Sequence, residues 1–102
     1  MQTTASFAVF EATARNQGFD ETLVREWAPN AVTPEHTHPF AVQALVVRGE
    51  LWLSHSGSTQ YLTAGSRFAL DPDVPHSERY GEAGATFWVA RRHKVLPTQA
   101  AA

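Results

Sequence analysis

Three histidines in the sequence have the residue type and the spacing of a metal site. His36 and His38 lie two residues apart in the stretch EHTHPF, and His76 directly follows the stretch DPDVP. Residues i and i+2 of an extended segment point to the same face, so the first two imidazoles can reach one ion at the roughly 2.0–2.1 Å of a metal–nitrogen bond. A strand returning beside them would add His76 as a third nitrogen ligand. The chain has no cysteine, which excludes disulfides and thiolate metal sites.

The segments around these histidines alternate in hydrophobicity with the period of two that is typical of β-strands. Strands are predicted over residues 21–27, 42–49, 50–57, 59–65, 66–71, 76–80 and 85–92. We expect turns at Gly49, over 56–58 and over 81–84. Short strands with turns at this spacing favour an all-β sandwich or barrel, which we expect to span about residues 21–92.

The start of the chain has the period of a helix instead. Phe7, Phe10 and Ala14 fall on one helical face, so we expect a short N-terminal α-helix over about residues 4–17. Gly18 supplies a natural stop. The hydroxyl residues that can cap the first turn are Thr3, Thr4 and Ser6.

Length and composition limit the number of domains and the classes of partner. The 102 residues amount to one domain, expected over residues 1–95, with a disordered tail over 96–102. The net charge is −2, and Arg91, Arg92 and Lys94 are too few for a nucleic-acid surface, so we expect them to be solvated. No apolar run approaches the roughly 18 residues of a membrane span, and the N-terminus does not resemble a signal peptide. We therefore expect a soluble, cytoplasmic protein that binds neither nucleic acid nor membrane.

Roughly residues 30 to 90 resemble the cupin superfamily. The first cupin motif, G-x5-H-x-H-x3–4-E-x6-G, corresponds to HTHPFAVQALVVRG, and the second, G-x5-P-x-G-x2-H-x3-N, to GSRFALDPDVPHSERY. The resemblance implies a small single-domain cupin, an antiparallel jelly-roll β-barrel. It also implies that His36, His38 and His76 bind one divalent transition metal. Iron, manganese, nickel, copper and zinc all remain open, because imidazole suits several of them.

The glutamate of the first motif is absent from this chain. Counting forward from His38 puts Gln43 in its place, whereas counting back from Gly49 puts Val42 there. We favour Gln43 as an inward-pointing fourth ligand, because a polar amide among apolar neighbours needs a partner, and Val42 is the alternative. Loss of the glutamate removes a negative charge, so an anionic substrate would bind more readily.

Two residues after His76 are candidates for catalysis. Glu78 lies two positions further along and faces the same way on a regular strand. A carboxylate in an apolar cavity beside a metal can act as a general acid or base. The alternative is exposure at the barrel rim, or a salt bridge to Arg25, Arg48 or Arg79. Tyr80 stands in place of the asparagine of the second motif and can extend its phenol over the pocket.

Two kinds of function agree with these features. The first is a metalloenzyme that acts on a small organic molecule, an anion among the candidates, by dioxygenation or by enolate-type isomerase or lyase chemistry. The alternative is a non-catalytic cupin module that binds a small ligand. Trp52 lies on the face opposite Leu51 and Leu53, and an outward aromatic side chain suggests a partner surface. Because small cupins pair through such faces, we expect a homodimer.

Overall fold

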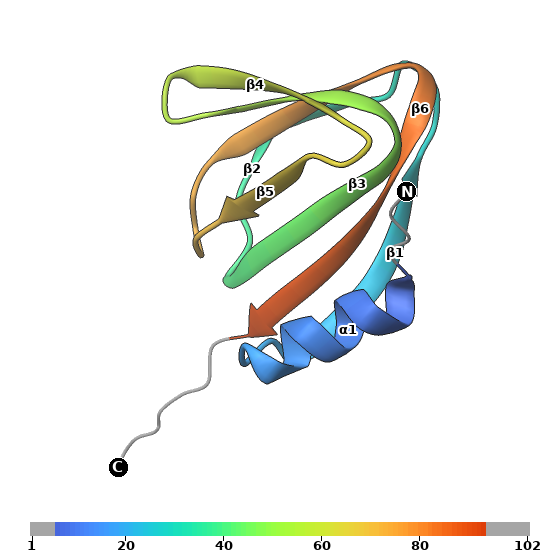
Figure 1. The fold of residues 1–102 in the computed structure, drawn as a ribbon. Helices are drawn as coiled ribbons and strands as arrows, with labels where there is room; N and C mark the ends of the chain where they lie inside the picture. The colour runs from blue at the N-terminus through green and yellow to red at the C-terminus, as the bar shows by residue number, and fades with distance from the viewer. Residues whose placement is uncertain (1–5, 94–102) are drawn as a thin grey trace.

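A computed structural model describes residues 6–93, in which the chain forms one helix and a six-stranded antiparallel sheet that curls into a barrel (Figure 1). In chain order the elements are α1 (Phe7–Asn16), β1 (Glu21–Trp27), β2 (Val32–His36), β3 (Phe40–His55), β4 (Ser58–Thr63), β5 (Arg67–Leu70) and β6 (His76–His93). The predicted all-β class with a short N-terminal helix is confirmed. The tail expected over 96–102 lies outside the described residues, as do 1–5 and 94–95 of the expected domain.

Two long strands, β3 and β6, form the centre of the barrel. They pair with each other from Phe40 opposite His93 to His55 opposite His76, with irregularities in register on either side of Arg48. Such irregularities bend a strand pair. One half of the pair therefore continues into β1 and β5, and the other half continues into β2 and β4. The result is two curved layers that share β3 and β6 (Figure 1).

The turns expected at Gly49 and over 81–84 are wrong, because both places are bends inside continuous strands. Gly49 and Gly84 have φ values of +80° and +69°, which favour glycine. The two residues also lie against each other, since a Cβ on Gly49 would stand 2.0 Å from the carbonyl oxygen of Gly84. The glycines thus mark a close approach of two bent strands. The tight turn expected over 56–58 is present between β3 and β4.

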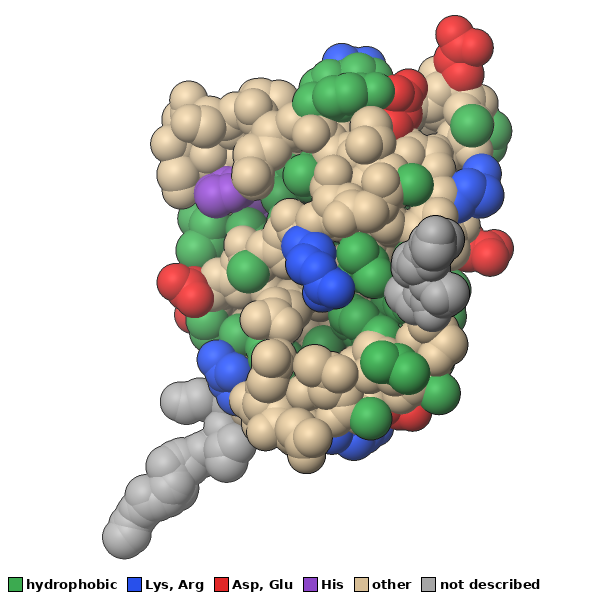
Figure 2. Space-filling model, in the orientation of Figure 1, with side chains coloured by type: hydrophobic (Ala, Val, Ile, Leu, Met, Phe, Trp, Pro, Cys, Tyr) green, Lys and Arg blue, Asp and Glu red, His purple; other side chains and the backbone are tan. Residues whose placement is uncertain are grey.

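The apolar core lies between the two layers. Leu51 and Leu53 are fully buried there, as are Val46 and Ala85 at the bend. Charged side chains stand mostly singly on the face drawn in Figure 2, in keeping with the net charge of −2. The fold therefore has one main core, and the barrel encloses it.

The helix α1 packs on the outside of this barrel. Oγ of Ser6 accepts a hydrogen bond from the Val9 amide at 3.2 Å, which confirms one of the three expected caps. Gly18 has a φ of +94°, and the Phe19 amide donates to the Ala14 carbonyl at 3.0 Å, so the helix ends where predicted. Ala14 and Phe19 form a second small core with Ala90 on the outer face of β6. No helix in the described part of the chain is long and apolar enough to cross a membrane.

Candidate metal centre

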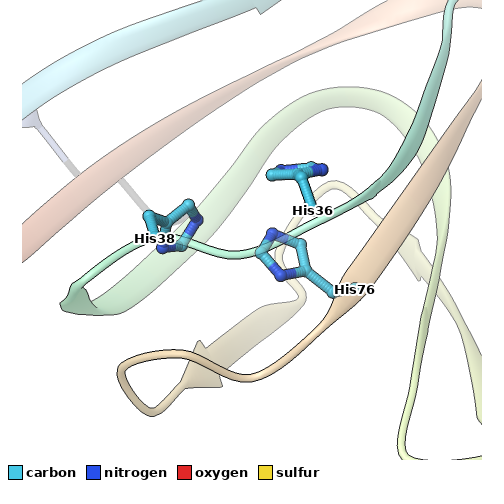
Figure 3. A group of neighbouring side chains, drawn as sticks. All are labelled: His36, His38 and His76. Atoms are coloured by element: carbon cyan, nitrogen blue, oxygen red, sulfur yellow. The ribbon is translucent and has the colours of Figure 1, made fainter.

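The fold brings His36, His38 and His76 together at one end of the barrel (Figure 3). His36 ends β2 and pairs with His76, the first residue of β6. His38 lies in the link between β2 and β3, where its carbonyl accepts a hydrogen bond from the Asp73 amide at 2.8 Å. One nitrogen of each ring lies within 4.8 Å of the others. Two nitrogens that bind one ion are at most about 4.2 Å apart, so small ring rotations suffice to form a metal site.

Hydrogen bonds orient two of the three rings. Nδ1 of His36 lies 2.8 Å from the carbonyl oxygen of Pro34, and Nδ1 of His76 lies 2.9 Å from that of Val74. A carbonyl can only accept, so each Nδ1 carries the proton and each Nε2 keeps a lone pair for a metal. The same arrangement of a ring N–H on a backbone carbonyl orients many metal-binding histidines.

The third ring also fits a metal ion. Nδ1 of His38 is buried without a hydrogen-bond partner among the described residues, so one of its nitrogens lacks a protein contact. Burial, and then the neighbouring His76, lower the pKa of His38. The ring is therefore neutral at pH 7, which is the form that binds metals. The donor set of three imidazoles suits a transition metal.

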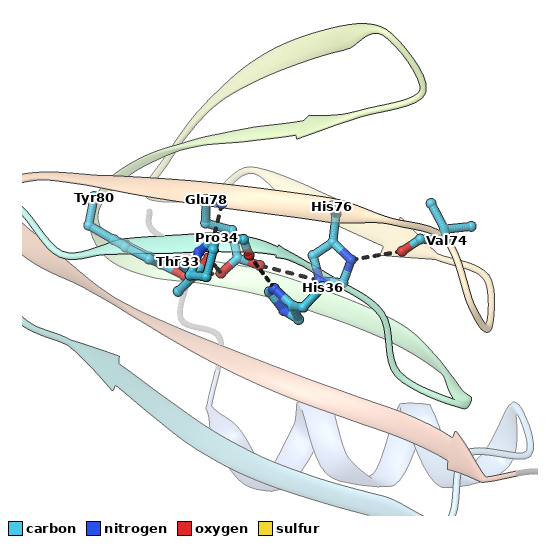
Figure 4. A network of polar contacts seen from close by, with 7 residues as sticks. All are labelled: Thr33, Pro34, His36, Val74, His76, Glu78 and Tyr80. Atoms are coloured by element: carbon cyan, nitrogen blue, oxygen red, sulfur yellow. Dashed lines mark hydrogen bonds and ion pairs between the residues drawn. The ribbon is translucent and has the colours of Figure 1, made fainter.

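A buried carboxylate stands beside this cluster. Oε2 of Glu78 lies 3.6 Å from Nε2 of His76. Its other oxygen, Oε1, accepts hydrogen bonds from the Thr33 hydroxyl at 3.2 Å and the Tyr80 hydroxyl at 3.0 Å (Figure 4). The Thr33 hydroxyl in turn accepts from the Glu78 amide at 3.1 Å. One oxygen is thus fixed by two hydroxyls, and the other is directed toward the histidines. No arginine of the described chain forms the salt bridge that was the alternative for Glu78.

A cavity of about 140 Å³ opens next to the cluster. It is lined by Arg25, Trp27, His36, His38, Phe40, Val42, Phe68, Leu70, Glu78, Phe87, Val89 and Arg91. Most of these side chains are apolar, with the histidines and Glu78 as the polar groups near the metal site. A small organic molecule can therefore lie against His36, His38 and Glu78 at once.

The pattern of the whole barrel matches one protein family. The model of the AraC-like ligand-binding domain matches residues 18–97. The chain belongs to this family. A comparison with curated proteins gave no match for this AraC-like domain.

Several solved structures are similar in fold to this AraC-like domain, a cupin among them. An RmlC-like cupin from Shewanella frigidimarina is 23% identical over 72% of this chain and 66% of that chain, with a TM-score of 0.62. KdgF from Halomonas sp. is 17% identical over 72% of this chain and 69% of its own, with a TM-score of 0.62. The DMSP lyase DddQ from Ruegeria pomeroyi is 20% identical over 78% of this chain and 40% of its own, with a TM-score of 0.67. These likenesses confirm the predicted small cupin barrel.

In this AraC-like domain Gln43 does not point toward the histidines, so its predicted inward position is wrong. Gln43 is exposed on the outer face of β3 and lines surface hollows next to α1, whereas Val42 is buried and lines the cavity. The inference failed because Leu45, on the same outer face and lining a hollow with α1, is buried as well, which makes both faces of β3 apolar. The position of the missing glutamate is therefore held by valine.

Tyr80 also differs from the expectation that its phenol extends over the pocket. It is 1% exposed and stacks on Trp27 with ring centroids 4.9 Å apart. Burial, and to a smaller extent the charge of Glu78, raise the pKa of Tyr80. The phenol therefore stays protonated and donates to Glu78, so Tyr80 positions that carboxylate from within the core.

Sequence reasoning missed two contributors to the site. Arg91, expected to be solvated, lines the cavity, and Thr33 holds Glu78. The inward position of Arg91 could have been predicted from the alternation along β6. Phe87, Val89 and Arg91 occupy every second position and therefore share one face. The Thr33 contact joins residues 45 positions apart, and no local pattern reveals it.

Proposed function

We propose that this AraC-like domain is a metal-dependent cupin enzyme that acts on a small organic molecule. The observation that carries the proposal is the convergence of three imidazoles, two of them oriented by hydrogen bonds, with a buried carboxylate next to one cavity. His36, His38 and His76 would hold one divalent ion of iron, manganese, nickel, copper or zinc. Among the similar structures, DddQ carries the name of a lyase, which supports an enzyme without identifying the substrate of this chain.

The reaction classes that fit are dioxygenation and enolate-type isomerase or lyase chemistry. An ion held by these three histidines would supply either polarisation of a carbonyl group or activation of O₂. The chain itself supplies the proton acceptor. Oε2 of Glu78 is the free oxygen of a buried carboxylate, while Thr33 and Tyr80 hold the other oxygen in place. A ligand proton directed at Oε2 would therefore meet an oriented base.

A second candidate function is the binding of a small ligand without turnover. The family match favours it, because the matching model is described as a ligand-binding domain. In that case the cavity would bind its ligand and release it unchanged. Incubation of the metal-loaded protein with candidate ligands, followed by mass spectrometry, separates the two, since only the enzyme forms a product.

Elemental analysis tests the metal site directly. The protein is purified after exposure to each of the five metals, and we expect about one ion per chain for at least one of them. His36→Ala and His76→Ala should abolish this stoichiometry. His93→Ala is the matched control, because His93 lies outside the cluster and contacts Glu21. Absence of metal from the wild-type protein under all five conditions would contradict the proposal.

We further propose a homodimer and a cytoplasmic location. Trp52 is half-buried on the outside of the barrel, where it packs against Tyr61, with ring centroids 5.0 Å apart, and against Arg79. Tyr61 is 55% exposed, so the aromatic pair offers part of its surface to a second copy. Light scattering coupled to size-exclusion chromatography measures the mass of the protein in solution. A mass of one chain at micromolar concentration would contradict the dimer.

A further inference from the structure

Two arginines, Arg25 and Arg91, line the same cavity as His36 and His38. Arg25 and Arg91 come from inward positions of β1 and β6. The guanidinium of Arg25 lies over the ring of Trp27 at 4.9 Å, and that of Arg91 lies over the ring of Phe40 at 4.7 Å. Both aromatic rings line the same cavity. The stacking holds the charged groups at the cavity wall, and the proposed metal chemistry uses neither of them.

Two buried donors in this wall have no acceptor within the described chain. They are Nε of Arg91 and Nε1 of Trp27. Buried N–H groups almost always have a hydrogen-bond partner, because an unpaired one loses its hydration without compensation. Both residues line the cavity, so the acceptor that completes them belongs inside it. These donors call for a ligand with hydrogen-bond acceptors.

The charges near the cavity favour an anion as that ligand. Arginine stays protonated at any ordinary pH. Glu21 approaches Nη1 of Arg91 only at 3.5 Å and is closer to His93, at 2.7 Å. Glu78 is engaged by two hydroxyls and lies beside His76. Arg25 forms no salt bridge with a carboxylate in residues 6–93. Two guanidinium groups thus line the cavity, and Glu21, 3.5 Å from Arg91, is the one carboxylate that pairs with either of them in residues 6–93.

We propose that the ligand of this cavity is a small organic carboxylate, whose negative charge is bound by Arg91 and Arg25. A carboxylate has two acceptor oxygens that match the guanidinium fork. Apart from His36, His38 and Glu78 the rest of the wall is apolar, so most of the body of the molecule is apolar as well. The volume of about 140 Å³ is close to that of an engineered cavity of about 150 Å³ that accommodates benzene. The inference rests on the proposed function only in taking this cavity as the ligand site.

Matched pairs of probes test the charge of the ligand. Benzoate and butyrate are compared with benzamide and butyramide, which have nearly the same shape and no charge, by isothermal titration calorimetry on the zinc-loaded and the metal-free protein. We expect each carboxylate to bind at least about tenfold more tightly than its amide. Equal affinities within the pairs, or no saturable binding of either carboxylate at millimolar concentration, would overturn the proposal.

Variants then test the two arginines. Arg91→Gln and Arg25→Gln should each weaken carboxylate binding about tenfold and leave amide binding unchanged. Arg92→Gln is the matched control, because Arg92 is the next residue on β6, is exposed and lies over Phe19 outside the barrel. Circular dichroism verifies the fold of each variant. A carboxylate preference that survives in both Gln variants would place the anion elsewhere and overturn the assignment.

The two protein forms separate this inference from the proposed function. Carboxylate binding that depends on Arg91 in a protein that takes up no metal would support the anion site and contradict the metalloenzyme. Normal metal content without a preference for carboxylates would support the metal site and contradict the anion site. Carboxylate binding that disappears with the metal but ignores both arginine variants would place the anion on the ion and overturn the inference.

Discussion

Oε2 of Glu78 lies 3.6 Å from Nε2 of His76. The two residues are two positions apart on β6 and therefore share a face. Nδ1 of His76 is occupied by the Val74 carbonyl, so Nε2 is the nitrogen available to a metal. A carboxylate next to that nitrogen places a negative charge where the ion would bind, although the first cupin motif contributes Val42 instead of a glutamate.

Glu78→Gln should weaken metal binding while leaving the fold intact. The variant keeps the shape and removes the charge beside the ion. Loss of a partner at this distance typically lowers metal affinity about 10–100-fold. Titration against a chelator of known affinity measures the change. Glu82→Gln serves as the control, since Glu82 is exposed at the bend of β6, and an equal effect of both variants would argue against a local role of Glu78.

Gln43→Ala should leave metal affinity within about twofold of the wild type. Its side chain lies on the outer face of β3, so its removal takes no group away from the ion. Changes at exposed positions away from special features also alter the free energy of unfolding by only about 0.5 kcal/mol. The same chelator titration, with His36→Ala as the positive control, checks this. A large loss of affinity would mean that Gln43 reaches the ion after all.

Alkaline pH should destabilise the folded protein through Tyr80. Its pKa is raised in the folded state by burial, whereas the unfolded chain ionises near the ordinary value of about 10. Above that pH the unfolded state binds fewer protons than the folded state, so the free energy of unfolding falls as the pH rises. In Tyr80→Phe this fall should be shallower between about pH 9 and about pH 11.

Denaturant unfolding at a series of pH values measures the effect. Tyr61→Phe is the matched control, because Tyr61 is the other tyrosine of the chain and is 55% exposed. If the two variants change the pH dependence equally, burial of Tyr80 is not the cause.

Gly49→Ala should destabilise the protein far more than Gly57→Ala. Both glycines have positive φ, at +80° and +79°, so both substitutions carry the backbone strain of about 1–2 kcal/mol. Only at Gly49 would the new Cβ also clash, 2.0 Å from the carbonyl oxygen of Gly84. We expect a loss of about 3 kcal/mol or more at Gly49. Thermal denaturation compares the two, and similar melting temperatures would argue against the close approach of β3 and β6.

The features of this structure that are predictable from sequence are those that local sequence patterns determine. Alternation identifies β1, and the spacing of His36, His38 and His76 identifies the cluster. The inward face of β3 is not predictable in this way, because Leu45 on the outer face is buried as well. A glycine such as Gly49 is typical both of a turn and of a bend within a strand. Only its pairing with β6 shows that β3 continues through it. The role of Thr33 depends on a contact that exists only in the folded barrel.

The position of β6 in both layers has a consequence for synthesis of the protein. β1 and β2 hydrogen-bond to β6 and to no other strand of the described chain. A nascent chain that has left the ribosome only as far as Pro75 therefore has no partner for either strand, although two of the three histidines have already emerged. Pairings over such long sequence separations are slow to form, on the order of milliseconds to seconds. We thus expect folding and metal uptake to follow translation of the last strand.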